Sequence, residues 1–381
     1  MSILFLDQSG ELGGAELFLV DLAESFKDRC LVGLFADGPH RRLLEQTGIS
    51  VQVLTAQSLK VRKNSSMLQG LSSMRQLVPL IATVAKLSQA HNLIYANTQK
   101  ALVVGALASA ISRRPLVFHL HDILSADHFS ATNRRIAVTL ANHFTSLIIA
   151  NSQATRAAFI AAGGRTDRLE VVYNGFDPNC YQVSTADTQH LRQQLGLSGQ
   201  FVIGHFSRLS PWKGQHILIE ALIHCPAAVT VLLVGDALFG EDTYVQQLHK
   251  QIADLGLQHR VRFLGFRSDV PQLMAACDLI AHTSTAPEPF GRVIVEAMLS
   301  GRPVVAAAAG GAVELISHGK TGWLTPPANS QKLAEIIQTC YSQPDRVAEV
   351  VHQASCTALE RFKLAAVNLQ IYQLLCQIAP V

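Results

Sequence analysis

The sequence predicts an α/β fold in which two doubly wound parallel sheets form two successive domains. Short apolar runs alternate with longer segments whose apolar residues recur every three to four positions, which indicates buried parallel strands separated by helices. This rhythm stops once, at a polar segment spanning 176–199, and then begins again. The length of 381 residues also suits two domains of ordinary size.

Each strand is predicted from one apolar run. In the first half of the chain the runs lie at 3–6, 30–36, 51–54, 93–96, 115–121, 147–150 and 170–175. In the second half they lie at 201–204, 229–235, 261–264, 279–282, 303–307 and 322–324. A helical pattern from about 346 to 377 closes the chain. We therefore expect an N-terminal domain at 1–178, a C-terminal domain at 179–357 and a final helix at 358–381.

Composition excludes several classes of protein. Apolar residues make up 49% of the chain and charged residues 15%, so a large core can form and intrinsic disorder is excluded as the main state. A net charge of +3 is too small for a general nucleic-acid coat. The seven cysteines form no CxxC motif, which favours a reducing compartment. No apolar stretch reaches the roughly 18–20 residues of a spanning helix. We expect a cytoplasmic protein that is soluble or peripheral on the membrane.

Two basic residues follow the first predicted strand of the second half. Arg208 and Lys213 precede Gly214 and a helix expected at 215–222, and ligands bind at the carboxyl ends of parallel strands. The arginine fork and the lysine point charge suit a diphosphate, and the helix N-terminus would add backbone donors. A solvated basic loop is the alternative interpretation.

Two glutamates follow the predicted strand at 279–282. Glu288 lies in a loop shaped by Pro289 and Gly291, and Glu296 lies about two turns into the next helix. Carboxylates spaced in this way can hold separate hydroxyls of one polyhydroxylated ligand, although a helix-cap glutamate and a helix-face glutamate would look the same. A glycine pair at 310–311 follows the next predicted strand and could offer donors to a phosphate or a sugar, or could simply begin a helix.

The first domain repeats this arrangement. Gly13 and Gly14 follow its first strand and would let the backbone approach a ligand closely, or would form only a tight turn. No GxGxxG fingerprint occurs, which argues against a dehydrogenase. His119 and His121 end the run at 115–121 and point to the same side, but no further ligand cluster supports a metal site. We expect His121 to contact a polar ligand and His119 to be a hydrogen-bonded core residue.

Together these motifs resemble the retaining family 4 glycosyltransferases of the GT-B fold, group 1 type. The resemblance covers nearly the whole chain and also includes 151–152, 172–177, 235–236 and 264–266. It implies two facing Rossmann-like domains with a cleft between them and a C-terminal helix that crosses back to the first domain. It implies transfer of a hexosyl group from a nucleotide sugar, with a UDP-sugar as the more frequent donor, to an acceptor hydroxyl.

The resemblance also implies a role for each site residue. Arg208 and Lys213 would bind the donor diphosphate, Glu288 the donor sugar and Glu296 the ribose. The backbone of Phe290 and Gly291 would lie close to the sugar, and Phe266 and Arg267 near the base. Gly14 would face the diphosphate and the acceptor, and His121 would contact the reacting sugar. The chain has no DxD pair, so we expect no metal, and no cofactor beyond the nucleotide-sugar substrate.

A run of basic residues indicates the acceptor. No Asp or Glu occurs from 46 through 121, whereas eight basic residues do: Lys60, Arg62, Lys63, Arg75, Lys86, Lys100, Arg113 and Arg114. Apolar residues at helical spacing over 67–81 predict a basic amphipathic helix on an anionic membrane, which Pro79 should interrupt. We expect a glycolipid acceptor; a core-packed helix beside a solvated basic loop is the alternative. A soluble acceptor, or a sugar-nucleotide 2-epimerase of the same fold, remain alternative functions.

Overall fold

The computed structural model describes residues 1–55, 67–126, 129–238 and 240–379, except the side chains of 67–76. The chain divides into two compact units. Unit 1 comprises Met1–Gly175 and Leu364–Val381, and unit 2 comprises Phe176–Lys363. The predicted boundaries after 178 and 357 lie near these divisions, but residues 358–363 belong to unit 2.

Unit 1 is built on a seven-stranded parallel sheet in the order β3-β2-β1-β4-β5-β6-β7. Its strands are β1 (Ile3–Asp7), β2 (Cys30–Leu34), β3 (Val51–Val53), β4 (Leu93–Ala96), β5 (Leu116–Leu120), β6 (Leu147–Ala150) and β7 (Leu169–Val171). Every predicted run of the first half overlaps one of these strands. The strand order reverses between β1 and β4, and ligands bind at such a point at the carboxyl edge of a doubly wound sheet.

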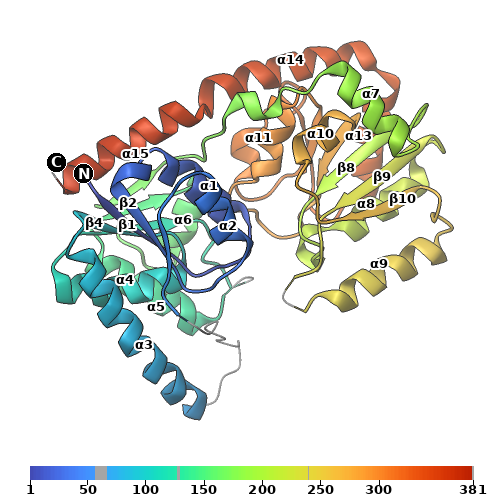
Figure 1. The fold of residues 1–381 in the computed structure, drawn as a ribbon. Helices are drawn as coiled ribbons and strands as arrows, with labels where there is room; N and C mark the ends of the chain where they lie inside the picture. Colours follow the sequence, from blue (N-terminus) through green and yellow to red (C-terminus); the bar gives the residue numbers. More distant parts are fainter. Residues whose placement is uncertain (56–66, 127–128, 239, 380–381) are drawn as a thin grey trace. The chain divides into compact units, whose positions relative to one another are not determined.

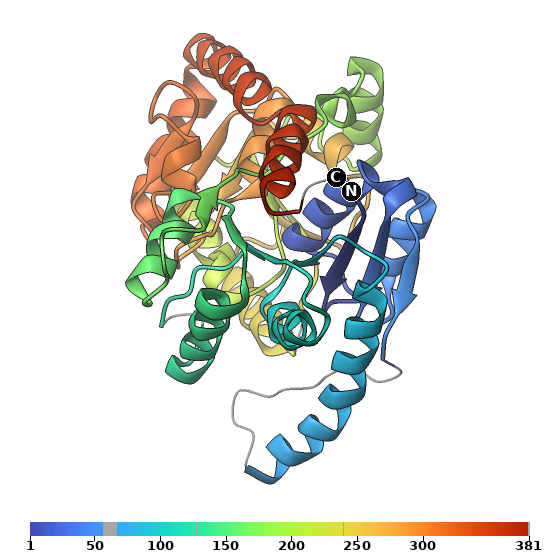
Figure 2. The ribbon, with the colours of Figure 1, turned by 90° about the vertical axis from the view of Figure 1, so that its left-hand side faces the viewer.

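Helices cover both faces of this sheet (Figures 1 and 2). They are α1 (Gly14–Glu24), α2 (Pro39–Gln46), α3 (Met67–Ser88), α4 (Gln99–Ser112), α5 (Ala131–Phe144), α6 (Gln153–Ala161) and α15 (Leu364–Ile378), with the 3-10 turn η1 (Lys27–Arg29). Val367, Ile371 and Leu375 of α15 are buried with Phe18 of α1 in one core cluster. The predicted return of the C-terminal helix to the first domain is therefore confirmed. Helix α3 continues through Pro79, so the expected interruption there was wrong.

Unit 2 contains a six-stranded parallel sheet in the order β10-β9-β8-β11-β12-β13. Its strands are β8 (Phe201–Phe206), β9 (Val229–Val234), β10 (Val261–Gly265), β11 (Leu279–His282), β12 (Val304–Ala307) and β13 (Trp323–Thr325). Each overlaps a predicted run. The order reverses between β8 and β11, and these two strands carry the loops in which the basic and acidic motifs lie.

The helices of unit 2 surround its sheet. They are α7 (Thr185–Gln194), α8 (Gln215–Ala221), α9 (Asp242–Asp254), α10 (Val270–Ala275), α11 (Arg292–Leu299), α12 (Ala312–Leu315), α13 (Ser330–Ser342) and α14 (Pro344–Arg361), with the 3-10 turns η2 (Pro178–Tyr181), η3 (Pro211–Lys213) and η4 (Leu222–His224). The polar segment expected as a linker thus holds η2 and α7. The single closing helical pattern is two helices, because α14 ends at Arg361 in unit 2 and α15 begins at Leu364 in unit 1. Within the described residues, no helix combines the length and apolarity needed to cross a membrane.

Candidate active site

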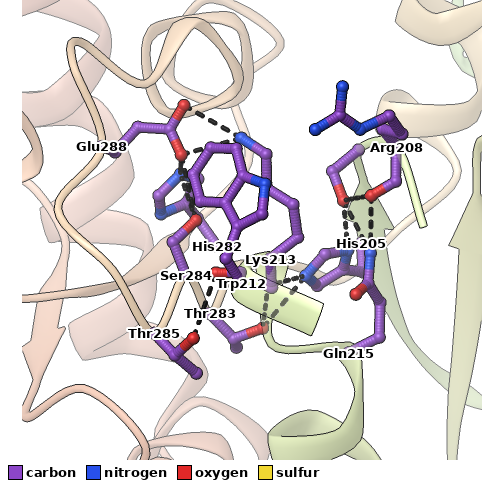
Figure 3. Close-up of polar contacts among 11 residues, drawn as sticks. His205, Arg208, Trp212, Lys213, Gln215, His282, Thr283, Ser284, Thr285 and Glu288 are labelled. Atoms are coloured by element: carbon purple, nitrogen blue, oxygen red, sulfur yellow. Dashed lines mark hydrogen bonds and ion pairs between the residues drawn. The ribbon is translucent and has the colours of Figure 1, made fainter. Parts of the chain in front are cut away.

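A buried ion pair lies where β8 and β11 end in unit 2. The Lys213 ammonium contacts both carboxylate oxygens of Glu288, at 2.9 Å from Oε1 and 2.8 Å from Oε2. The side chains are only 16% and 13% exposed. Ser284 donates its hydroxyl proton to Glu288 Oε2 at 3.0 Å, and His282 Nε2 lies 3.3 Å from the same oxygen. Figure 3 shows the side chains of Lys213, His282 and Ser284 pointing toward this carboxylate.

Glu288 is held as an anion by this environment. Burial opposes its ionisation, but the Lys213 charge and the hydrogen bond from His282 outweigh burial and hold the pKa of Glu288 well below its usual range. An ionised carboxylate can only accept hydrogen bonds, so His282 must carry its proton on Nε2. The other ring nitrogen, Nδ1, is buried without a hydrogen-bond partner among the described residues.

The backbone positions Lys213 by tying η3 to the end of β11. Thr283 donates its hydroxyl proton to the Gly214 carbonyl at 2.8 Å, and the Thr285 amide donates to the Trp212 carbonyl at 2.8 Å. Gly214 has φ 72°, and a Cβ there would overlap the Thr283 carbonyl, so the turn requires glycine. The Lys213 ammonium also lies 4.0 Å from the centroid of the Trp212 ring.

The glycine pair at 310–311 supports Glu288 from the neighbouring loop. The Gly311 amide donates to the Glu288 carbonyl at 2.7 Å. Gly310 has φ 62°, and a Cβ on it would overlap the same carbonyl. The Gly311 N–H, one of the donors that could have served a phosphate or a sugar, thus fixes the loop that carries Glu288. Gly311 also directly precedes α12, in agreement with the alternative that the pair begins a helix.

Arg208 is paired with a carboxylate that the sequence did not single out. Its Nε lies 3.2 Å from Glu241 Oε2, and Ser210 donates to Glu241 Oε1 at 2.5 Å. Glu241 immediately precedes α9. The second cation predicted for a diphosphate is thus held by an acidic residue from the following strand–helix connection.

Glu296 lies in α11, where sequence reasoning placed it. Burial raises its pKa despite the nearby Arg292 charge, and Arg292 Nε is 3.4 Å from Glu296 Oε1. Phe290 is 2% exposed. Its ring lies 6.3 Å from that of Phe176, centroid to centroid, so its side chain belongs to the core and only its backbone can face a ligand. Gly291 precedes α11 with φ 94°.

Phe266 and Arg267 follow β10. Phe266 is 66% exposed, and its backbone N–H donates to Asp236 Oδ2 at 2.9 Å. Arg267 forms a two-point ion pair with Asp269, with Nη2–Oδ2 at 2.6 Å and Nε–Oδ1 at 2.7 Å. An exposed aromatic face beside a strand end is available for stacking, whereas this guanidinium is already engaged.

Unit 1 carries a buried acidic pair beside its glycine loop. Gly14 begins α1. Burial raises the pKa of Asp7, at the end of β1, to about 6. Burial together with the Asp7 charge raises the pKa of Glu16 to about 8. The Glu16 carboxylate lies against Gly13, where a Cβ would come within 2.8 Å of Oε2. The glycine loop therefore packs over a carboxyl group.

His119 lies in β5 and His121 directly follows this strand, and the surroundings of the two side chains differ. His121 Nε2 is 2.9 Å from Asn97 Oδ1, and His121 is partly exposed. His119 is fully buried, with the Tyr95 hydroxyl 2.7 Å from Nδ1 and no hydrogen-bond partner for Nε2 among the described residues. His119 is therefore only half satisfied, contrary to the expectation. No group of three or more His, Cys, Asp or Glu in the described part of the chain could hold a metal ion.

The structure thus gathers Lys213 and Glu288 with Ser284 and His282, and sets Arg208 and Glu296 in separate pairs of unit 2. Sequence reasoning missed His282, Ser284 and Glu241. A histidine at the end of an otherwise apolar run was a usable signal for His282, because a polar residue in a buried strand needs a partner. No pattern in the neighbouring sequence indicates a role for Glu241, because its contact with Ser210 joins positions 31 residues apart.

Both halves of the chain match known families. Residues 12–179 match the family described as Glycosyltransferase Family 4, and residues 187–355 match Glycosyl transferases group 1. HepE of Anabaena, with crystal structures in complex with UDP-glucose and with UDP and glucose, is 60% identical with a TM-score of 0.93. That likeness covers 99% of this chain and 100% of HepE. A glycosyltransferase of Rickettsia africae, 21% identical with a TM-score of 0.82, shows the same fold.

Curated relatives are more distant. Spore coat protein SA of Bacillus subtilis is 28% identical over 59% of this chain and 62% of its own length. A D-inositol 3-phosphate glycosyltransferase of Corynebacterium aurimucosum is 29% identical over 70% of this chain and 67% of its own length. A GDP-mannose-dependent phosphatidylinositol monomannoside mannosyltransferase of Mycolicibacterium smegmatis is 31% identical over 52% of this chain and 53% of its own length. The chain therefore spans about half to two thirds of these proteins.

Proposed function

Because this chain belongs to the family 4, group 1 glycosyltransferases, which transfer a sugar from a nucleotide sugar, we propose that its donor is a UDP-hexose and that transfer proceeds with retention to the hydroxyl of a membrane glycolipid. The Lys213–Glu288 pair carries this proposal, since the cation that we assign to the diphosphate contacts the carboxylate that we assign to the donor sugar. The 60% identity to HepE, whose structures contain UDP and UDP-glucose, supports the choice of base and sugar.

In the proposed mechanism, unit 2 stabilises the departing diphosphate. Breaking the anomeric bond places negative charge on the diphosphate and positive charge on the sugar. Lys213 and Arg208 are fixed cations that stabilise the first of these charges, an electrostatic contribution that needs no reorganisation during the reaction. Glu288 accepts hydrogen bonds from the sugar hydroxyls, and Glu296 accepts them from the ribose.

The remaining residues orient the substrates. The exposed Phe266 ring stacks near the base, beside Arg267, and the backbone of Phe290 and Gly291 borders the sugar. In unit 1, Gly14 faces the diphosphate and the acceptor, and His121 contacts the reacting sugar. Transfer needs no metal, because two cations neutralise the diphosphate and the chain has no DxD pair. Activity that survives EDTA without loss is the expected result.

A donor screen tests the reaction. UDP-glucose, UDP-galactose, GDP-mannose and UDP-N-acetylglucosamine are incubated with the protein, and released nucleotide is measured with and without lipid and soluble acceptors. Release of UDP together with a glycosylated acceptor of retained anomeric configuration is expected. UDP release with an epimerised free sugar would instead identify a 2-epimerase, and consumption of GDP-mannose alone would contradict the UDP assignment.

The lipid acceptor is proposed from the surface of α3 and α4. Val78 on α3 is 62% exposed and Ile111 on α4 is 63% exposed. Arg113 and Arg114 follow directly, within the acid-free stretch from 46 through 121. Exposed apolar side chains beside basic ones suit an anionic membrane surface. Lys60, Arg62 and Lys63 lie outside the described residues, and the side chain of Arg75 is likewise not described.

Co-sedimentation with vesicles tests membrane contact. Binding should rise with the fraction of anionic lipid and fall with salt, because basic residues on an anionic surface each contribute about 1 kcal/mol. Changing Lys60, Arg62, Lys63 and Arg75 to Ser should abolish it. The matched control changes four exposed basic residues of unit 2 to Ser: Lys250, Lys320, Lys332 and Arg346. Equal losses in both variants, or no binding at low salt, would favour a soluble acceptor.

A further inference from the structure

A buried histidine of unit 2 contacts the main chain that carries Lys213. His205 lies in β8 and is 2% exposed. Its Nε2 is 3.2 Å from the Lys213 carbonyl oxygen and 3.0 Å from Thr283 Oγ1. Thr283 is also buried and directly follows β11. His205 therefore joins the loop after its own strand to the end of the neighbouring strand, and these contacts can be followed in Figure 3.

The acceptors around Thr283 determine which nitrogen of His205 carries the proton. Thr283 Oγ1 is 2.8 Å from the Gly214 carbonyl oxygen and 3.1 Å from the Lys213 carbonyl oxygen. Both carbonyls can only accept hydrogen bonds, and the hydroxyl has a single proton to donate. Since that proton goes to the nearer carbonyl, the Lys213 carbonyl takes its hydrogen bond from His205 Nε2. A ring protonated on Nδ1 alone would set a lone pair against this carbonyl.

The His205 ring is uncharged. Burial and the proximity of His282 lower the pKa of His205 to about 3. With the proton on Nε2, the lone pair of the neutral ring lies on Nδ1. A neutral ring also adds no positive charge behind Lys213, so it supports the lysine main chain without weakening the attraction between the lysine ammonium and Glu288.

The carbonyl of Arg208 is held by the same group of side chains. Gln215 begins α8 and is fully buried. Its Nε2 donates to the Arg208 carbonyl at 2.9 Å and to Ser207 Oγ at 2.9 Å. A flipped amide would set Oε1 against that carbonyl, so the orientation is fixed. Because Gln215 supplies the Arg208 carbonyl with a donor, the Ser207 hydroxyl can donate to His205 Nδ1, which lies 3.3 Å away.

We propose that His205 is a positioning residue: with its proton on Nε2, it fixes the main chain of Lys213 against the end of β11 and so holds the lysine ammonium for Glu288 and the donor diphosphate. The inference rests on the proposed function only where it assigns Lys213 to the diphosphate. Without the His205 donor, the Thr283 hydroxyl would have to serve both carbonyls, and the turn that carries Lys213 could shift. A misplacement of about 1 Å in a reaction site can lower the rate by about 10²-fold.

Three substitutions of His205 test the need for a donor at Nε2. His205→Leu removes both ring nitrogens, His205→Asn places an amide near Nδ1, and His205→Gln extends an amide N–H to the position of Nε2. For UDP release from UDP-glucose with acceptor, kcat/KM should fall about 10- to 100-fold in the Leu and Asn variants. His205→Gln should recover most of this loss.

The matched control is a histidine of the same unit that also bonds to the main chain. His318 is exposed and precedes β13, and its Nδ1 accepts from the Leu324 amide at 3.0 Å. His318→Leu should leave kcat/KM unchanged. Because His318 is exposed and His205 is buried, the comparison of His205→Gln with His205→Asn provides the control for burial.

A double-variant cycle distinguishes positioning from a general loss of stability. If His205 acts through Lys213, then His205→Leu should lower kcat/KM by less than about twofold further in a protein that already carries Lys213→Met. If His205 instead supports unit 2 as a whole, the two losses should multiply. This result would overturn the proposal.

Nuclear magnetic resonance of the full chain labelled with ¹⁵N-histidine measures the proton position without any substrate. The His205 signals are those lost in His205→Gln, and they should show Nε2 protonated and Nδ1 not. A proton on Nδ1 alone, or equal activity in His205→Asn and His205→Gln, would overturn the role of His205 even if sugar transfer were normal. The expected tautomer in a protein that transfers no sugar would leave the positioning intact and refute the proposed function. If His205→Leu does not fold, His205→Asn replaces it in the cycle.

Discussion

Removing Lys213 should destabilise unit 2 far more than removing an exposed lysine does. In Lys213→Met the Glu288 carboxylate would remain buried, and its remaining partners among the described residues would be Ser284 and His282. Lys213 Nζ and Glu288 Oε2 are 2.8 Å apart. At an effective dielectric constant of about 20, the Coulomb attraction lost in the variant is about 6 kcal/mol. Desolvation of the ammonium offsets part of it, so the expected net cost is about 3–5 kcal/mol, the usual range for breaking a buried pair.

A double-variant cycle isolates the interaction energy between Lys213 and Glu288. The double variant Lys213→Met with Glu288→Gln removes both charges and should recover most of the loss, because no buried charge is left unpaired. The chain has two tryptophans, Trp212 and Trp323, and both lie in unit 2. Their fluorescence during urea unfolding therefore reports on this unit specifically.

The control is an exposed pair in the same unit. Lys250 and Asp254 on α9 are 2.6 Å apart but 76% and 60% exposed, so Lys250→Met should cost less than about 0.5 kcal/mol. The reasoning would be refuted if Lys213→Met cost no more than this control, or if the two single losses simply added in the double variant.

The loss of stability caused by Lys213→Met should be smaller at acidic pH, and the direction of this change follows from the pKa of Glu288. Its pKa is lowered in the folded protein, so its stabilising contribution is present above its ordinary pKa of about 4.5 and is lost as pH falls toward the folded value. In Lys213→Met the buried carboxyl can instead take up a proton. The difference in stability between wild type and variant should therefore become smaller as pH falls.

Three further predictions concern single positions. Arg208→Ala should lower kcat/KM for transfer by about 10²–10³, the cost of losing one oxyanion-stabilising group, whereas Glu296→Ala should chiefly weaken UDP binding in calorimetry. Gly310→Ala should destabilise unit 2 and cut activity because its Cβ would overlap a backbone carbonyl, while Gly256→Ala, with a similar φ of 67° and no described atom within 4 Å of its Cβ, should leave activity unchanged. The raised pKa of Glu16 means that the folded state binds one more proton than the unfolded state between about pH 4.5 and 8, so the free energy of unfolding should fall as pH rises through this range. Glu16→Gln should make this fall smaller, as measured by unfolding monitored with circular dichroism.

Strand positions could be predicted because strands buried on both faces are continuous apolar runs. The run at 93–96 coincides with β4, and that at 279–282 with β11. Helix ends carry a weaker signal. Helix α14 ends next to Phe362, where the chain passes from unit 2 into unit 1. The helical spacing of apolar residues nevertheless continues past this point. A break between two amphipathic helices leaves this spacing unchanged, so the sequence does not show where one helix ends.

Site residues could be placed on loops from the sequence, but their partners could not. Lys213 and Glu288 are 75 residues apart, and only the adjacency of β8 and β11 brings them together. Strand order is set by long-range packing that a local pattern does not encode. His205 did carry a local signal, as a polar residue directly after the run at 201–204, but the position of its proton depends on the Lys213 and Gly214 carbonyls, which no sequence pattern marks.

The two cations that we propose for the donor diphosphate share one property: each is paired with a carboxylate of this chain. Lys213 contacts Glu288 and Arg208 contacts Glu241. A diphosphate must therefore compete with a protein carboxylate for each cation, which lowers the net gain from binding free nucleotide. The competition also has a use. When the diphosphate takes Lys213, the Glu288 oxygens lose their strongest partner and become available to sugar hydroxyls. A nucleotide that carries a sugar replaces both halves of the pair, whereas free UDP replaces only one. If these residues bind the donor as proposed, the site should favour the intact donor, and Lys213→Met should reduce the preference for UDP-glucose over UDP in competition binding. An unchanged ratio would show that the pair is only structural.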